Sequence, residues 1–95
     1  MIFEKLFAKN VPTSKELTVI VRSKTKLLYE KPSQSVSLKN DLGPFDILPE
    51  HENFISSTAG DITIISTKGE KWNTTHQIGI VKVTTDKVEV VVLDD

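Results

Sequence analysis

The sequence contains no cysteine, which excludes disulfide bonds, thiolate metal sites and thiol nucleophiles and is consistent with a reducing compartment. No segment approaches the roughly 20 apolar residues that a membrane-spanning helix requires. Residues 1–8 hold no apolar stretch long enough for a secretory signal. Neither sign of charge is in excess, because 12 basic residues accompany 13 acidic ones. Nucleic-acid partners, which require clustered Lys and Arg, are therefore not expected, and the 95 residues predict one cytoplasmic domain with a modest core.

Motifs for catalysis are also missing. There is no Gly-x-Ser-x-Gly elbow and no Gly-rich phosphate loop. The only candidate metal cluster combines Glu50-His51-Glu52 with His76, and a chain with two histidines and no cysteine supplies too few ligands for a catalytic zinc site. We expect no catalytic residue, no metal and no cofactor, and therefore no enzyme.

Short alternating apolar segments, separated by turn residues, fill the sequence after residue 16. This spacing is typical of an all-β sandwich or barrel. The predicted strands are 17–22, 27–30, 33–38, 45–48, 54–57, 62–66, 71–74, 78–83 and 88–93. We expect a flattened β-sandwich of about nine to ten short strands over residues 17–95, with an interruption at Lys31 and Pro32.

The N-terminal extension, residues 1–16, has a different pattern. Ile2, Phe3, Leu6 and Phe7 recur at helical spacing, which predicts one or two helical turns that end at Asn10 and Pro12. An isolated helix of this length is marginal in water. The pattern leaves open whether the extension packs on the domain, binds a partner or frays.

Several predicted strands are apolar on both faces. In the strand 62–66, Ile62 and Ile64 alternate with Ile65, and in the last strand three valines alternate with Val91 and Leu93. A two-layer sandwich requires only one apolar face on each strand. A partner, or the N-terminal extension, is therefore expected to cover part of an outer face. The single tryptophan, Trp72, is either a core residue or an interface anchor.

The most informative stretch is Ser35–His51. Val36 and Leu38 alternate with serines, as in a half-buried strand, and the next six residues contain Asn, Asp, Gly and Pro, which favour turns. A second apolar strand, 45–48, ends at Pro49. The pattern predicts a hairpin with its tip at Lys39–Asp46.

This stretch resembles the epsilon subunit of F-type ATP synthase, which is called delta in mitochondria. That family typically reads Ser-Val-Ser-Leu-Pro-Gly-x-x-Gly-x-Phe-Gly-Ile-Leu-Pro-x-His. The residues that agree in register are Ser35, Val36, Ser37, Leu38, Gly43, Phe45, Ile47, Leu48, Pro49 and His51. Further agreement comes from Leu28-Tyr29-Glu30, from Gly79–Val83 and from Asp86–Val90, so the resemblance covers roughly residues 17–95.

The resemblance implies a non-catalytic subunit of the central stalk that links a gamma subunit to the ring of c subunits during proton- or sodium-coupled ATP synthesis. It implies peripheral attachment to the inner face of a membrane through the complex, without insertion. The residues implied to contact the c-ring are Lys39, Asn40, Asp41, Leu42, Gly43, Pro44, Asp46 and His51. Phe45, Ile47, Leu48 and Gly79 are implied to be structural, through hairpin shape and core anchoring.

The sequence departs from the family at the tip, where Pro44 and Asp46 stand in place of a polar residue and a glycine. It also stops at Asp95, where most bacterial members continue into a two-helix C-terminal domain, which we expect to be absent. Because a fold does not fix a function, the alternative is a stand-alone β-sandwich adaptor that reuses this fold in another complex.

Overall fold

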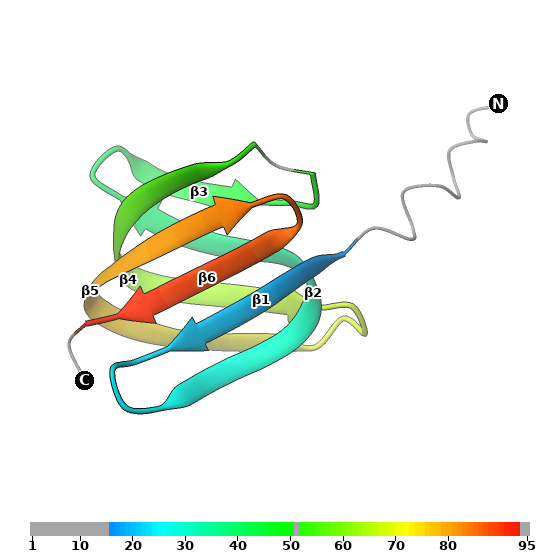
Figure 1. The fold of residues 1–95 in the computed structure, drawn as a ribbon. Helices are drawn as coiled ribbons and strands as arrows, with labels where there is room; N and C mark the ends of the chain where they lie inside the picture. Colours follow the sequence, from blue (N-terminus) through cyan, green and yellow to red (C-terminus); the bar gives the residue numbers. More distant parts are fainter. Residues whose placement is uncertain (1–15, 51, 94–95) are drawn as a thin grey trace, which may run out of the picture.

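The computed structural model describes residues 16–50 and 52–93, which form six β-strands (Figure 1). These are β1 (Leu17–Arg22), β2 (Leu27–Asn40), β3 (Gly43–Ile47), β4 (Phe54–Ser66), β5 (Lys71–Thr84) and β6 (Lys87–Val92). Within this part of the chain, no helix has the length and apolar character needed to cross a membrane. The predicted helical turns of the N-terminal extension, which end at Asn10 and Pro12, lie outside the described residues.

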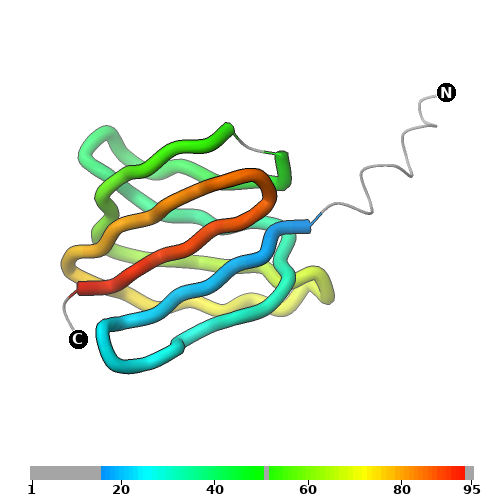
Figure 2. Tube along the Cα trace, in the orientation of Figure 1, coloured from blue at the N-terminus to red at the C-terminus, as the bar shows by residue number. Residues whose placement is uncertain are grey.

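The strands form one sheet that closes on itself. Their order is β1-β6-β5-β4-β2-β3, and an additional pairing of β1 with β2 completes a flattened barrel (Figure 2). All neighbours are antiparallel except β1 and β6, which are parallel. The all-β sandwich class predicted from the sequence is therefore confirmed.

The predicted number of strands, nine to ten, is too high. Three strands, β2, β4 and β5, are 13 or 14 residues long, and each contains two of the predicted segments. Their halves lie in different layers of the barrel, because β4 and β5 curve from one layer into the other (Figure 1). A sequence pattern reveals the change of inward and outward positions at such a bend, but it does not reveal that the chain stays hydrogen-bonded through it.

The bend in β4 and β5 results from a β-bulge. Thr58 pairs with Gly79 and Gly60 pairs with His76, so one residue on β4 lies opposite two on β5. An extra residue bends a strand and increases its twist. Gly60 has a φ of 93°, a value that glycine adopts without the steric cost that a Cβ would impose.

The predicted interruption at Lys31 and Pro32 is also wrong, because β2 runs through both residues. The first half of β2 pairs with β1 up to Ser33, and the second half pairs with β4 from Ser33 onward. Proline is tolerated where regular pairing is disturbed, and β2 changes partner and carries a register shift immediately after Pro32.

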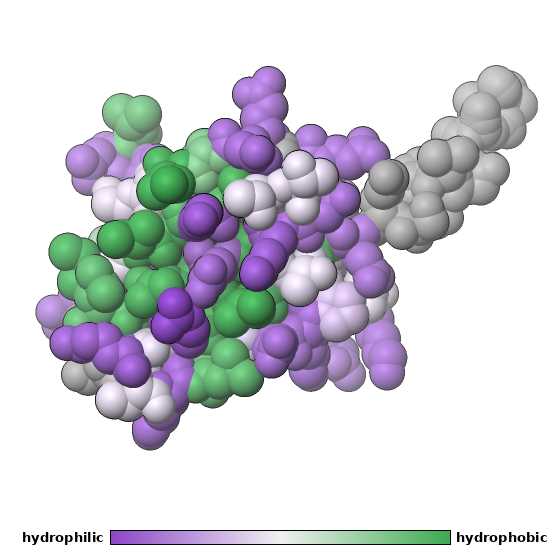
Figure 3. Space-filling view, viewed as in Figure 1, coloured by the Kyte–Doolittle hydropathy of each residue, from purple (hydrophilic) through white to green (hydrophobic). Residues whose placement is uncertain are grey.

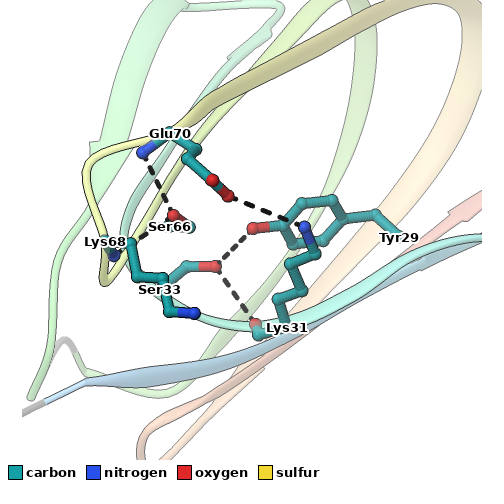
Figure 4. Close-up of polar contacts among 6 residues, drawn as sticks. All are labelled: Tyr29, Lys31, Ser33, Ser66, Lys68 and Glu70. Atoms are coloured by element: carbon teal, nitrogen blue, oxygen red, sulfur yellow. Dashed lines mark hydrogen bonds and ion pairs between the residues drawn. The ribbon is translucent and has the colours of Figure 1, made fainter.

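A polar cluster that includes Tyr29, Ser33 and Ser66 lies where β2 changes from pairing with β1 to pairing with β4 (Figure 4). The buried hydroxyls of Tyr29 and Ser33 lie 2.8 Å apart. Across the corner, Ser66 Oγ accepts hydrogen bonds from the backbone N–H groups of Lys68 and Glu70, at 3.2 and 3.1 Å. The cluster thereby gives the buried hydroxyls partners. The backbone N–H of Thr67 donates to the carbonyl oxygen of Pro32 at 3.2 Å, and this bond holds the β4–β5 turn against β2.

The core fills the space between the two layers. It consists of inward-facing aliphatic residues with one tyrosine, and Phe45, Phe54 and Trp72 pack at its margin. Its buried members are Leu17, Val19, Val21, Tyr29, Val36, Leu38, Ile47, Ile62, Ile64, Val81, Val83, Val88, Val90 and Val92. Trp72 lies with its ring 5.0 Å from that of Tyr29, so its environment is mainly that of a core residue.

Candidate functional site

The predicted hairpin is formed by β2 and β3, and it ends in a shorter turn than the sequence suggests. Lys39 pairs with Pro44 and Asn40 pairs with Gly43, which leaves only Asp41 and Leu42 unpaired. Gly43 has a φ of 119°, outside the range that residues with a Cβ readily adopt. The hairpin therefore stays regular almost to its end.

The side-chain amide of Asn40 holds the tip in place through two hydrogen bonds, one at its oxygen and one at its nitrogen. Its Oδ1 accepts a hydrogen bond from the backbone N–H of Leu42 at 2.9 Å. Its Nδ2 donates to Ser56 Oγ on β4 at 3.1 Å. These two bonds couple the turn to the neighbouring strand, so Leu42 is presented from a fixed base.

Leu42 is the most exposed large apolar side chain among the described residues, at 96%. Lys39, Asp41, Pro44 and Asp46 are also exposed, and Asn40 and Gly43 are half-buried. The structure thus brings seven of the eight predicted tip residues together on one hairpin. The eighth, His51, lies outside the described residues.

The residues predicted to be structural differ in burial. Ile47 is fully buried, whereas Phe45 is half-buried and packs edge-to-face on Phe54, with ring centroids 5.9 Å apart. Leu48 is 54% exposed because it follows the last residue of β3, where the inward–outward alternation ends. Gly79 is buried at the β4–β5 bulge.

A second surface is the apolar outer face over β4, β5 and β6. Ile55, Ile78, Ile80 and Leu93 are 68%, 53%, 45% and 36% exposed. Ile80 pairs with Val91, which also points outward. Figure 3 shows apolar surface gathered on the side of the molecule where these strands lie. We call these five residues the outer apolar face; they include Val91 and Leu93, which the sequence pattern singled out.

A groove of about 480 Å³ separates the hairpin tip from the β4–β5 bulge. Its lining comes from three strands and comprises Lys39, Asn40, Asp41, Ser57, Thr58, Ala59, Gly60, Gln77 and Ile78. The sequence did not predict this groove, because it depends on the bulge that brings β4 and β5 beside the end of β2. The glycines at 60 and 79, on paired strands, are the only local signal of it.

The two polar side chains behind the groove are buried. His76 Nδ1 lies 2.8 Å from the carbonyl oxygen of Gly60, while His76 Nε2 and Thr58 Oγ1 have no hydrogen-bond partner among the described residues. In the described ranges, no group of three or more His, Asp or Glu side chains could hold a metal ion. The candidate site consists of three surface features: the hairpin tip, the groove and the outer apolar face.

Comparisons with known proteins agree with this geometry. The sequence profile of the family described as the beta-sandwich domain of the ATP synthase delta/epsilon chain matches residues 16–94. No curated protein matches the chain.

Two solved structures share the fold. One is a chain in the cryo-EM structure of the Euglena gracilis mitochondrial ATP synthase with its OSCP, F1 and c-ring, at a TM-score of 0.76 and 17% identity. The other is in the central stalk and c-ring of the Tetrahymena thermophila mitochondrial ATP synthase, at a TM-score of 0.71 and 19% identity. Each match covers 82% of this chain, but only 51% of the Euglena chain and 63% of the Tetrahymena chain.

The family match extends over most of the sequence and over every strand of the barrel. The resemblance seen in the hairpin motif is thereby confirmed for the whole domain. The chain belongs to the delta/epsilon family of ATP synthase subunits, and residues 16–94 are its β-sandwich domain.

Proposed function

We propose that the chain is a non-catalytic rotor subunit that links a gamma-like subunit to a ring of c-like subunits in an ATP synthase. The observation that carries the proposal is the position of two exposed surfaces on the family's fold. The hairpin tip, with Leu42 96% exposed, would contact the c-ring, and the outer apolar face would contact the gamma-like subunit. The chain would then lie at the membrane surface without entering it, where the gradient of protons or sodium ions drives rotation.

The physical demands of this role are stiffness and buried contact area. A rotor element transmits torque, so its surfaces must keep their positions relative to one another under load. Three features support the proposal: the closed barrel has few free strand edges, Asn40 joins the tip to β4, and the Ser66 hydroxyl holds the β4–β5 turn. Exposed apolar side chains gathered on one face are typical of interaction sites.

The first test is purification of the tagged full chain from its own cells in mild detergent, with mass spectrometry of the bound proteins. Recovery of gamma, c and the catalytic subunits is the expected result. Recovery of an unrelated complex without these subunits would contradict the rotor role and favour the adaptor.

Two variants separate the surfaces. Leu42→Asp should reduce recovery of the c subunit at least tenfold, because a charge replaces the exposed apolar side chain of the tip. The gamma subunit should remain bound, because the outer apolar face is unchanged. Ile80→Glu should release the gamma subunit by the same reasoning. Asn73→Ala, at an exposed position outside both surfaces, is the matched control. Equal recovery of all subunits with all three variants would contradict the assignment of the surfaces.

A further inference from the structure

The groove behind the tip is lined by one cationic side chain, Lys39, that forms no ion pair with the described residues. The side chain of Lys39 makes no ion pair or hydrogen bond with any residue in the ranges 16–50 and 52–93. Yet it does not simply extend into solvent, because its stem lies across the backbone of β4. A Cβ at Gly60 would come within 2.8 Å of Lys39 Cε and 3.4 Å of Lys39 Nζ.

Gly60 makes this position possible. Its lack of a side chain leaves room for the lysine stem, and its φ of 93° is part of the bulge that His76 stabilises through the carbonyl oxygen of Gly60. Lysine commonly packs its methylene groups on other atoms while its ammonium group stays accessible. Here that arrangement places Lys39 Cε and Nζ beside Gly60, among the residues that line the groove.

The remaining lining is suited to a protein loop. Ile78, which is 53% exposed, and Ala59 give the groove an apolar wall, and Asn40 and Ser57 add polar groups. Asp41 also lines the groove, from the two-residue turn at its outer end, and it is exposed. The volume of about 480 Å³ is large enough for one side chain with its adjoining backbone.

We infer that this groove binds an Asp or Glu side chain from a loop of the protein that the tip contacts, with Lys39 Nζ as the counter-charge. The inference rests on the proposed function, since it places that loop on the c-ring. A carboxylate is favoured because it pairs with the one cation in the groove lining, while Ile78 covers the adjacent part of the loop. Asp41 opposes the same carboxylate, so the two charged residues have opposite effects on binding.

Variants at these two positions give opposite predicted results. We would measure the affinity of the full chain for the purified c-ring in detergent at low salt. Lys39→Gln should weaken binding about fivefold and flatten its salt dependence, whereas Lys39→Arg should retain most of the affinity. Asp41→Asn should tighten binding about twofold. Lys68→Gln, at an exposed lysine on the β4–β5 turn, should leave the affinity unchanged.

Carbodiimide cross-linking tests the contact directly, because it joins an amine to a carboxylate only when the two groups touch. The amine of Lys39 should become linked by an amide bond to an acidic residue of the c subunit, which mass spectrometry would identify. Failure of the wild-type chain to bind the c-ring would overturn the rotor function together with this inference. A complex that Leu42→Asp abolishes, but that forms normally with Lys39→Gln and gives no cross-link at Lys39, would overturn the inference alone.

Discussion

At the scale of single residues, Gly79 and Gly43 are required for two different structural reasons. Gly79 is buried at the bulge, where a Cβ would come within 2.8 Å of the Val91 carbonyl oxygen and 3.0 Å of His76 Cδ2. Gly43, in contrast, has no atom within 4 Å of the place a Cβ would take, but its φ is 119°. The first glycine is required by packing and the second by backbone conformation.

Alanine substitutions should separate these constraints. Gly79→Ala should lower the free energy of unfolding by about 1–3 kcal/mol, because backbone and ring atoms must move to admit the methyl group. Gly43→Ala should cost about 1–2 kcal/mol through backbone strain alone. Guanidinium denaturation measures both. If Gly79→Ala proved as stable as the wild type, the close packing around Gly79 would be refuted.

Phe45, which the resemblance implies to be structural, is half-buried and packs against the core. A fully buried phenylalanine would lose about 3–5 kcal/mol on truncation to alanine. Because Phe45 is only half-buried and retains one aromatic contact, with Phe54, we expect Phe45→Ala to cost about 2 kcal/mol. Thermal or chemical denaturation provides the test, and an unchanged melting midpoint would show that the ring contributes nothing to stability.

At the scale of elements, the turns and bulges determine how the long strands cross between layers. The β4–β5 turn is held by Ser66, a buried residue whose hydroxyl accepts two backbone hydrogen bonds. Gln34, at the register shift of β2, donates to the carbonyl oxygen of Ser66 at 3.0 Å. The turn and the crossing of β2 therefore stabilise one another.

Removal of the Ser66 hydroxyl should weaken this corner. Ser66→Ala leaves the N–H groups of Lys68 and Glu70 without their acceptor, and we expect a loss of about 1–2 kcal/mol. Faster hydrogen exchange at these two amides is the specific readout. Ser57→Ala, at an exposed position of β4, is the control. Exchange rates that stay the same at both amides would show that the hydroxyl does not hold the turn.

At the scale of the whole molecule, one core joins both layers. Leu17 in β1 and Ile64 in β4 are both fully buried, although they lie in different layers. The strands β2, β4 and β5 each continue from one layer into the other. Neither layer can therefore unfold without disrupting strands that also belong to the other layer. The barrel is therefore expected to unfold in one step.

Two truncations and two probes can check this cooperativity. Leu17→Ala and Ile64→Ala should each cost about 2–5 kcal/mol. In both variants, the fluorescence of Trp72 and the far-UV circular dichroism should give the same unfolding midpoint. Midpoints that differ between the probes would indicate that the layers unfold separately.

The sequence predicted the fold class well because inward and outward residues alternate in every strand. The nine predicted strand segments lie almost entirely within the six observed strands, and Gly43, in the predicted hairpin tip, has a positive φ that glycine favours. The prediction from sequence failed at Pro32 and at the β4–β5 bulge. At both places local residues predict the end of a strand, but pairing with distant residues continues it. The groove beside Lys39 was missed for the same reason.

The amino-acid sequence by itself determined the family, the all-β class and the exposed hairpin tip, because each depends on residues close together in the chain. Only the tertiary structure decided which strand halves share a layer, that Lys39 lies across Gly60, and that five apolar residues from three strands form one outer face. These features depend on contacts between residues far apart in sequence. Such contacts are set by the bulge and by closure of the sheet, neither of which leaves a periodic pattern in the chain.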